Sequence, residues 1–325
     1  MTKKLKVAIV GAGRMGRTRA LAAEKCGASV GYICEPIAQI ASELSTELPH
    51  AKTIRTPADI EWSDIDAVFI CTPPSERGPI ELTAIQHGVP FFVEKPVGLS
   101  AESIGHVADE LATNPLLTAV GYMNRCRRSV QQLRKWAGRN RLLGMSISWL
   151  VGMYGVPWWS KKDGSGGPVN EQATHLVDLA RYLVGEISAV QALSQPNPKH
   201  PELIGSASIN WQFENGEMGS MLYSCLAQEK MIRLHLFAEA EERVLCGWDF
   251  RLVGDDSTTV AYADRNQIFD VETEQFLRAV QAGANSSELC SFEDAMCTQR
   301  VIDAIHRSAQ SGSVERVATS PREQH

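Results

Sequence analysis

A glycine pattern near the start of the chain restricts the local fold more than any other feature of the sequence. The segment G-A-G-R-M-G at 11–16 follows the apolar run LKVAIV at 5–10 and precedes a helical stretch that ends near Gly27. At a strand-to-helix junction, such glycines permit a tight turn, let a pyrophosphate approach the backbone, and allow close helix packing. This segment is therefore predicted to be a phosphate-binding loop. Its cofactor-binding residues are Gly11, Gly13, Arg14, Met15 and Gly16.

An acidic residue supports this interpretation. Glu35 follows the second apolar run and comes 19 residues after Gly16. A carboxylate at that place accepts hydrogen bonds from the adenosine ribose and repels a 2′-phosphate. The following residues, in EPIAQIAS at 35–42, include no Arg or Lys that could bind such a phosphate. The sequence therefore predicts NAD as the cofactor and disfavours NADP.

Residues 5–121 alternate between short apolar runs and helical stretches. The runs are four to six residues long without strict polar alternation, which is typical of strands covered on both faces. The segments between them are long enough for crossover helices. We expect an α/β Rossmann domain with a doubly wound parallel sheet over 1–122. The predicted strands are LKVAIV at 5–10, ASVGYI at 28–33, DAVFIC at 66–71, VPFFV at 89–93 and LLTAV at 116–120.

The pattern changes after Gly121. The segment SASINWQF at 206–213 alternates apolar and polar residues, and Asn215-Gly216 after it is a strong hairpin signal. We expect a C-terminal α+β domain with an open, mainly antiparallel sheet over 123–318, and a frayed tail at 319–325. Helices are predicted at 127–137, up to Gly185, at 270–282 and at 291–309, and the final ones are expected to be able to pack back on the first domain.

Composition excludes several classes of protein. A length of 325 residues predicts about two domains, and 44% hydrophobic residues provide a sizeable core. The net charge of −6 argues against a nucleic-acid partner. No apolar run approaches the roughly 18 residues that span a bilayer, and the N-terminus has no cleavage-site pattern, so a cytoplasmic location without membrane association is expected. The eight cysteines form no C-x-x-C pair, which favours reduced thiols.

Two motifs fall where predicted strands end. Thr72-Pro73 follows one strand and Glu94-Lys95-Pro96 closes another, and carboxyl ends of parallel strands are where open α/β sheets bind ligands. With these motifs the chain resembles the Gfo/Idh/MocA oxidoreductase family, which is named after glucose-fructose oxidoreductase, inositol dehydrogenase and the rhizopine-catabolism protein MocA.

The resemblance implies roles for particular residues. It places Lys95 beside the nicotinamide and a reacting hydroxyl or carbonyl, and assigns Thr72, Pro73, Glu94 and Tyr122 to the cofactor site. It continues through GYMNR, where Tyr122, Asn124 and Arg125 match a segment lining the nicotinamide pocket, and through PWW at 157–159. One departure is that Arg77 or its neighbours stand where the family often has a histidine.

A helix predicted between Pro168 and Gly185 carries the clearest acid-base pattern. At about 100° per residue, Glu171, His175 and Asp178, with Tyr182, fall on one stripe beside a separate apolar face. A histidine suits proton exchange with a carbinol, and a carboxylate one turn away can orient its ring. The family commonly has Asp-x-x-x-His here, and Glu171, whose side chain is longer, is a departure from that pattern.

Other interpretations of this region remain open. His175 and Asp178 also fit a polar pair on an exposed helix. The spacing of Glu171 and His175 resembles a two-ligand metal site, but a third ligand and an H-E-x-x-H frame are missing, so no metal is predicted. Trp158 and Trp159 can either face the C–H side of a sugar ring or anchor their loop in the core.

The sequence predicts an NAD(H)-dependent oxidoreductase of a sugar, polyol or cyclitol. Lys95 and His175 are expected in proton transfer, with Glu171 and Asp178 tuning His175. The predicted substrate contacts are Tyr122, Asn124, Arg125, Trp158, Trp159 and His175. Alternatives are a redox-neutral enzyme that recycles its cofactor, including glycoside cleavage, and a non-catalytic NAD-binding sensor. A homo-oligomer, a dimer or tetramer joined through the C-terminal sheet, is expected because the outer face of SASINWQF has no charges.

Overall fold

The computed structural model describes residues 4–254 and 267–317, so the predicted tail at 319–325 lies outside the described residues. The chain forms two compact units. The described residues of the first unit are 4–98, 102–126 and 267–294, and those of the second are 99–101, 127–254 and 295–317. The first unit therefore combines an N-terminal stretch with a segment from near the end of the chain.

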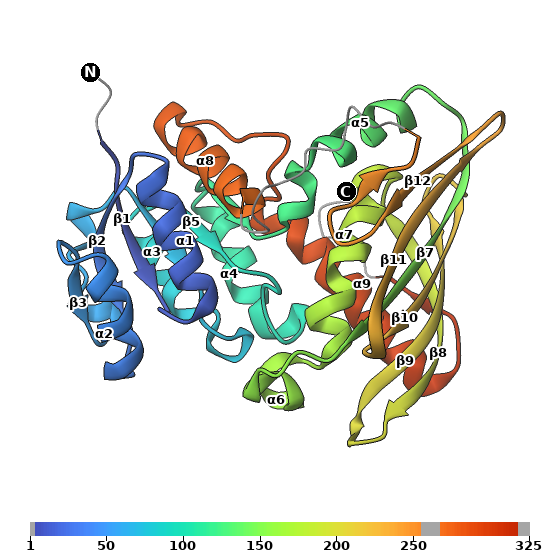
Figure 1. The fold of residues 1–325 in the computed structure, drawn as a ribbon, viewed down its shortest axis with the longest axis horizontal. Helices are drawn as coiled ribbons and strands as arrows, with labels where there is room; N and C mark the ends of the chain where they lie inside the picture. The colour runs from blue at the N-terminus through green and yellow to red at the C-terminus, as the bar shows by residue number, and fades with distance from the viewer. Residues whose placement is uncertain (1–3, 255–266, 318–325) are drawn as a thin grey trace. The chain divides into compact units, whose positions relative to one another are not determined.

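The first unit contains a six-stranded parallel sheet in the order β3-β2-β1-β4-β5-β6 (Figure 1). The five predicted strands are confirmed, whereas β3 was not predicted because its first two residues, Lys52 and Thr53, are exposed and polar. The strands are β1 (Lys6–Val10), β2 (Ser29–Cys34), β3 (Lys52–Ile54), β4 (Ala67–Ile70), β5 (Phe91–Val93) and β6 (Thr118–Val120).

Helices connect these strands as crossovers. They are α1 (Arg14–Lys25), α2 (Ala38–Glu47), α3 (Pro79–Gln86) and α4 (Ala101–Thr113). A further helix, α8 (Gln267–Ala282), comes from the C-terminal part of the chain and packs against α1 (Figure 1). Its Phe276 ring lies 5.3 Å from that of Phe69 and 5.5 Å from that of Phe92, so α8 closes the core over two central strands. The C-terminal segment is thus an integral part of the first unit.

The second unit contains an eight-stranded sheet in the order β13-β12-β11-β7-β10-β9-β8-β14. Neighbouring strands are antiparallel except β7 and β10, which are parallel. The predicted mainly antiparallel sheet is confirmed, with this one mixed pairing. The strands are β7 (Leu142–Gly152), β8 (Ile187–Asn197), β9 (His200–Phe213), β10 (Met218–Ser224), β11 (Leu226–Ala238), β12 (Glu242–Cys246), β13 (Arg251–Leu252) and β14 (Glu315–Arg316).

One face of this sheet forms the core of the second unit. The predicted alternation on β9 is confirmed, since Ala207, Ile209, Trp211 and Phe213 are buried while Ser208, Asn210 and Gln212 are exposed. The hairpin predicted at Asn215-Gly216 joins β9 to β10, with Gly216 at φ 97°. The inner face packs against α5 (Arg128–Ala137), α7 (Thr174–Leu183) and α9 (Phe292–Ser311), and a short α6 (Lys162–Ser165) precedes α7 (Figure 1).

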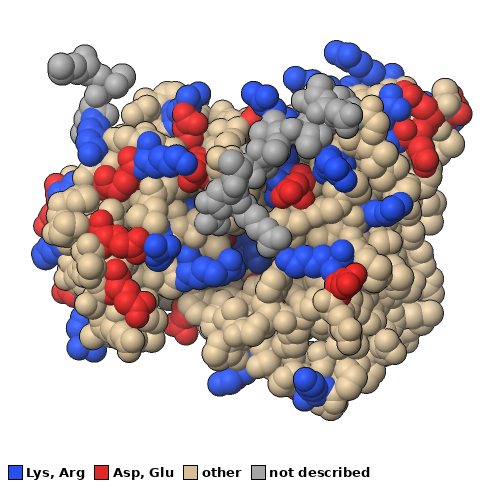
Figure 2. Space-filling view, viewed as in Figure 1, with Lys and Arg blue, Asp and Glu red and all other residues tan. Residues whose placement is uncertain are grey.

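Acidic and basic side chains are mixed over the first unit on the face that Figure 2 presents. Within residues 4–254 and 267–317, no helix is both long and apolar enough to cross a membrane. The eight cysteines, all within the described part of the chain, form no disulfide.

Candidate functional site

The three glycines of the loop between β1 and α1 meet different steric demands. Gly11 has φ +87°, and a Cβ there would lie 2.9 Å from the backbone of Cys71. A Cβ on Gly16 would lie 1.8 Å from the carbonyl oxygen of Gly11. A Cβ on Gly13 would have no neighbour within 4 Å, and this residue is exposed. The first and third glycines therefore shape the loop, while the second leaves its outer side open.

The loop ends at a helix N-terminus suited to an anion. Gly13 is the N-cap of α1, and no side chain caps the helix. The first backbone N–H groups of a helix lack partners within the helix and carry partial positive charge. Arg14 is exposed and Met15 is half-buried beside them. A phosphate in the open space at Gly13 would find donors and a favourable dipole.

Glu35 lies against this loop at the end of β2. Its Oε2 accepts a hydrogen bond from the backbone N–H of Ala12 at 2.9 Å, and its Oε1 accepts one from Ile37 at 3.0 Å. The side chain is buried, at 7% exposure. These two bonds fix the carboxylate beside the phosphate loop, and each oxygen keeps acceptor capacity for a ribose hydroxyl.

The remaining predicted cofactor residues follow neighbouring strands. Thr72-Pro73 follows β4, Glu94-Lys95 follows β5 and Tyr122 follows β6, and all the strands of this sheet are parallel. The strand order reverses between β1 and β4, which is the topological switch point where such sheets bind ligands. The Oγ1 atom of Thr72 is buried there without a hydrogen-bond partner in the described part of the chain. These residues fit a dinucleotide whose polar groups would satisfy Thr72 and the loop.

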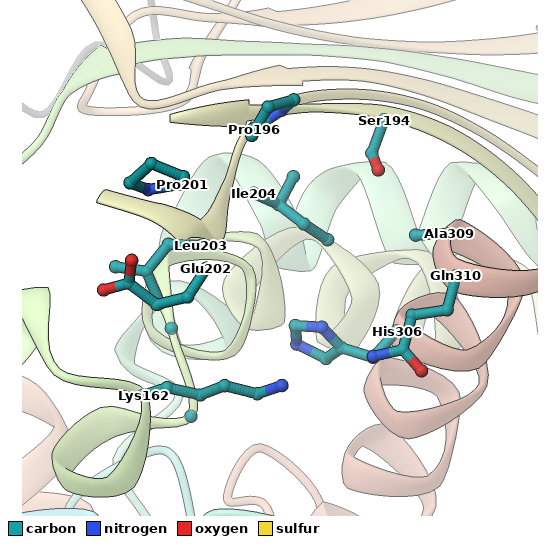
Figure 3. Close-up of a pocket in the computed structure, with 12 residues that line it drawn as sticks. Lys162, Ser194, Pro196, Pro201, Glu202, Leu203, Ile204, His306, Ala309 and Gln310 are labelled. Carbon is teal, nitrogen blue, oxygen red and sulfur yellow. The ribbon is translucent and has the colours of Figure 1, made fainter. Parts of the chain in front are cut away.

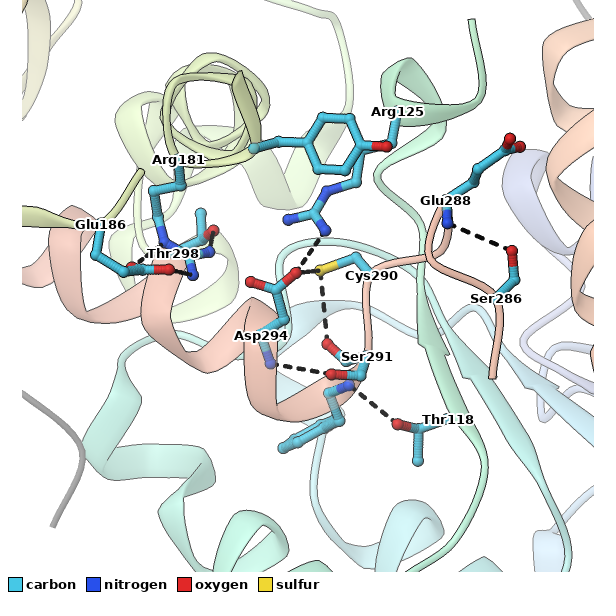
Figure 4. Close-up of polar contacts among 12 residues, drawn as sticks. Thr118, Arg125, Arg181, Glu186, Ser286, Glu288, Cys290, Ser291, Asp294 and Thr298 are labelled. Carbon is cyan, nitrogen blue, oxygen red and sulfur yellow. Dashed lines mark hydrogen bonds and ion pairs between the residues drawn. The ribbon is translucent and has the colours of Figure 1, made fainter. Parts of the chain in front are cut away.

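The segment predicted to line the nicotinamide pocket is buried. Tyr122, Asn124 and Arg125 are exposed by only 2%, 3% and 4%, and the last two lie in a 3₁₀ turn at Met123–Cys126. Figure 4 shows that Arg125 forms an ion pair with Asp294, whose backbone N–H donates to Ser291 Oγ at the start of α9. The Arg125 guanidinium is therefore already bound to α9 on one side.

Arg77, at the place where the family often has histidine, is also buried. Its Nη1 donates a hydrogen bond of 2.8 Å to the carbonyl oxygen of Ile70 at the end of β4. This contact supports the strand end rather than an open pocket.

In the second unit, the helix predicted from Pro168 to Gly185 is not continuous. Residues Val169–Ala173 form a π-helical turn, and α7 begins only at Thr174. The helical-wheel angle predicted for Glu171 is therefore wrong, because a π turn holds more residues than an α turn. His175 and Asp178 do lie on α7.

The polar stripe is not exposed either. Glu171, His175 and Asp178 are exposed by 1%, 7% and 1%, and the apolar side of α7 is equally buried. The alternative of a polar pair on an exposed helix is therefore excluded. Buried acid-base groups of this kind are expected where burial can tune proton transfer.

Side chains of the π turn attach it to its surroundings. Gln172 Nε2 donates to the carbonyl oxygen of Gly152 at 3.3 Å, and its Oε1 accepts from Tyr223 Oη at 3.0 Å. Asn170 Nδ2 donates to the Ser165 carbonyl at 2.9 Å, and its Oδ1 accepts from Gln299 Nε2 at 3.0 Å. These contacts join the turn to β7, β10 and α9, so the position of Glu171 is set by tertiary contacts.

Aromatic residues that the sequence analysis did not select lie near His175. The ring of Trp149 on β7 is 6.5 Å from the His175 ring and 6.0 Å from the Trp248 ring. Its inward position could have been found from the alternation in MSISWLVGM. Trp159 is buried and packs edge-on against Tyr154, with ring centroids 5.0 Å apart, whereas Trp158 is half-buried. The loop-anchoring interpretation therefore suits Trp159 better than Trp158.

A separate pocket of about 170 Å³ occurs in the second unit (Figure 3). None of the predicted site residues lines it. No group of three or more His, Cys, Asp or Glu side chains suited to a metal occurs among residues 4–254 and 267–317. The pocket is lined by Lys162, Gly166, Gly167, Ser194, Pro196, Pro201, Glu202, Leu203, Ile204, His306, Ala309 and Gln310.

Two family models match the chain. Residues 5–122 match the Gfo/Idh/MocA model described as an oxidoreductase family with an NAD-binding Rossmann fold. Residues 138–243 match the model of a Gfo/Idh/MocA C-terminal domain. The two matched ranges lie in the two structural units and together cover most of the chain.

Individual relatives agree with this match. The chain is 27% identical to scyllo-inositol 2-dehydrogenase (NAD(+)) of Bacillus subtilis over 68% of its own length and 67% of that protein. It is 31% identical to the rhizopine catabolism protein MocA of Rhizobium meliloti over 56% of its own length and 58% of that protein. This match therefore covers less than two thirds of either protein. A levoglucosan dehydrogenase solved in complex with NADH superposes with a TM-score of 0.88 at 22% identity, covering 98% of this chain and 100% of that one.

Proposed function

The chain belongs to the Gfo/Idh/MocA family of oxidoreductases, whose first domain is an NAD-binding Rossmann fold, and we propose that it transfers hydride between NAD(H) and a secondary alcohol or ketone of a sugar, polyol or cyclitol. One observation carries this proposal most strongly. The glycine loop, Glu35, Thr72 and Lys95 follow four neighbouring strands at the carboxyl edge of one parallel sheet.

The first unit's residues would hold the cofactor as follows. The backbone at Gly13 and the N-terminus of α1 receive the pyrophosphate, and Glu35 receives the adenosine ribose. Thr72, Pro73, Lys95 and Tyr122 border the nicotinamide end. When bound, the nicotinamide takes up or supplies the hydride.

Proton transfer is assigned to Lys95 and His175. In the oxidation direction, a ring nitrogen of His175 accepts the hydroxyl proton while the Lys95 ammonium donates a hydrogen bond to the oxygen that becomes a carbonyl. Glu171 and Asp178 orient the His175 ring. The substrate class is supported by relatives named as inositol dehydrogenases and by a relative solved with NADH and L-sorbose.

Single substitutions test these assignments. Lys95→Ala and His175→Ala should each lower turnover by about 10²–10⁴-fold and leave NADH affinity within about threefold, because they remove acid-base groups rather than phosphate contacts. Glu171→Gln should cost less. Oxidation should rise with pH as His175 loses its proton, and this limb should vanish in His175→Ala. Near-normal turnover with an unchanged pH profile in His175→Ala would show that another residue acts as the base.

A substrate screen separates this function from its alternatives. Sugars, inositols and amino sugars would be tested for NAD⁺ reduction, and ketones for NADH oxidation. Product formation without net change in NADH absorbance would instead indicate redox-neutral cofactor recycling. Cofactor binding without turnover on any compound would favour a sensor.

Two further expectations belong to the proposal. We expect a homo-oligomer joined through the large sheet, supported by the uncharged outer row on β9. A cytoplasmic location stays a prediction from the sequence.

A further inference from the structure

We propose that Arg19, Glu94 and Glu272 form a buried ionic cluster that positions the nicotinamide end of the cofactor site, an inference that rests on the proposed function. The three residues come from α1, the end of β5 and α8. All of them lie in the first unit, and none was selected from the sequence for this purpose.

Arg19 connects the three elements through its guanidinium group. Its side chain is fully buried. Nε donates to Glu94 Oε1 at 2.7 Å, and Nη2 donates to Glu272 Oε2 at 2.5 Å. Nη1 donates to Thr273 Oγ1 at 3.2 Å and to the Phe269 carbonyl at 3.3 Å. Every nitrogen of the group therefore has a partner on α8 or on Glu94, the residue after β5.

The surroundings keep this cation charged. The guanidinium carbon lies 4.3 Å from the centre of the Phe92 ring and 5.2 Å from that of Phe269. Burial by itself would lower the pKa of Arg19, but the adjacent Glu94 and Glu272 carboxylates raise it above its usual value. Buried ion pairs cost desolvation energy and add little net stability, whereas loss of one member is strongly destabilising. Such a cluster is better explained by the geometry that it imposes than by stability.

Glu94 transmits that geometry to the strand end. Its backbone N–H donates to the carbonyl oxygen of Ile70 on β4 at 2.9 Å. A Cβ atom on Gly121, directly after β6, would lie only 2.7 Å from Glu94 Oε2. The Glu94 carboxylate therefore occupies the space that a side chain at position 121 would need. The next residue in the chain is Lys95. The cluster therefore fixes Lys95's backbone between the ends of β4 and β6, and Glu94 acts as a positioning residue rather than a cofactor ligand.

The two halves of the cofactor site depend on different contacts. The phosphate and adenosine half uses Gly13, the first turn of α1 and Glu35, whereas Arg19 lies in the second turn of α1 and points to Glu94 and Glu272. The nicotinamide half uses the ends of β4, β5 and β6, where Glu94 is held. Disturbing the cluster should therefore weaken binding of NADH and spare binding of ADP-ribose, which lacks the nicotinamide.

Two variants test this separation in the full-length protein. Gly121→Ala keeps every charge but places a methyl group against Glu94 Oε2. Arg19→Lys keeps the positive charge but cannot bridge both carboxylates. The matched control is Gly105→Ala on α4, in the same unit, where a Cβ would meet no atom within 4 Å. Dissociation constants for NADH and ADP-ribose would be measured by calorimetric titration, with circular dichroism to confirm folding.

The expected result is a split between the two ligands. Both variants should bind NADH at least about tenfold more weakly, because small misplacements of a site carry large costs, and should bind ADP-ribose within about twofold of the control. Equal losses for both ligands, or unchanged NADH binding in Gly121→Ala, would overturn the inference. If Arg19→Lys does not fold, Gly121→Ala decides alone. Failure of the unsubstituted protein to bind either ligand would instead refute the proposed function.

Discussion

At the scale of single residues, Glu35 binds the backbone of the glycine loop, and we predict that it also selects the cofactor. Its carboxylate accepts from the backbone N–H of Ala12, so it lies beside the position expected for the adenosine ribose. We predict tighter binding of NADH than of NADPH, because this fixed negative charge repels a 2′-phosphate. Replacing Glu35 by Ser and Pro36 by Arg should narrow or reverse the preference.

Titration of cofactor fluorescence measures both affinities. Glu43→Ser on the exposed side of α2 removes the same charge from the same unit and should leave the preference unchanged. Equal or tighter binding of NADPH by the unsubstituted protein would contradict the prediction.

His306 predicts a pH dependence of stability. Burial, followed by the charge of Lys162, lowers the pKa of His306 from 6.5 to about 4. In the folded protein this imidazole stays neutral at pH 5–6, whereas the unfolded chain binds a proton below about 6.5. Proton uptake by the unfolded chain therefore removes stability as pH falls from about 6.5 towards 4.

Replacing His306 by Gln should weaken this dependence. Between pH 7 and pH 5 the melting temperature of the unsubstituted protein should fall by about 2–4 °C more than that of the variant. Identical changes in melting temperature for the two proteins would rule out His306 as the titrating group.

Residues in local patterns could be predicted, whereas long-range partners could not. Gly11 and Gly16 act within one strand-turn-helix segment, so their spacing between a predicted strand and a predicted helix indicated their steric roles in the turn. Arg19 pairs with residues 75 and 253 positions away in the chain. No local periodicity encodes such a pair, and an arginine on a helix ordinarily indicates a solvated surface.

At the scale of elements, those with a regular alternation of buried and exposed residues were predicted most accurately. The alternation on β9 was predicted correctly because one side faces the core and the other faces outward. The π turn at Val169–Ala173 was not predicted, because the polar stripe that includes Glu171 indicated a regular α-helix and all five residues of the turn are in fact buried. Contacts of Asn170 and Gln172 with β7, β10 and α9, rather than helix propensity, hold this turn.

The pairing of β9 with β10 depends on one glycine. Gly219 lies opposite Trp211, and a Cβ there would come 1.9 Å from Trp211 Nε1. Gly219→Ala should therefore displace the buried indole and destabilise the protein by about 1–3 kcal/mol, the usual range for an overpacked core. Ser220→Ala, on the opposite face of β10, is the control, and urea unfolding would compare the two. Equal urea midpoints for Gly219→Ala and Ser220→Ala would show that the Trp211 side chain can move without loss of stability.

At the scale of the whole molecule, the outer face of the large sheet predicts self-association. Leu193, Ser208 and Leu222 stand in register on three adjacent strands, and the two leucines are exposed by 68% and 50%. A row of exposed leucines among uncharged serines and amides suits an isologous contact between two copies. We therefore predict a dimer or tetramer in solution.

Leu222→Glu should dissociate this assembly by burying an unpaired charge, and Ile37→Glu, at an equally exposed residue of the first unit, should not. Light scattering at micromolar concentration measures the mass. A mass near the 35.6 kDa of one chain for the unsubstituted protein would contradict the prediction.

The packing of α8 against α1 has a consequence for how the chain is made. A ribosome releases β1–β6 long before it reaches Gln267, and between the two it releases all the strands of the large sheet except β14. During that interval Arg19 and Glu94 are present while Glu272 and the Phe276 ring are not. Until Gln267–Ala282 has been synthesised, the nascent first unit therefore has an apolar surface on two central strands and an Arg19 side chain with only one of its two carboxylate partners. A fragment ending at Cys126 would remain permanently in that unfinished state.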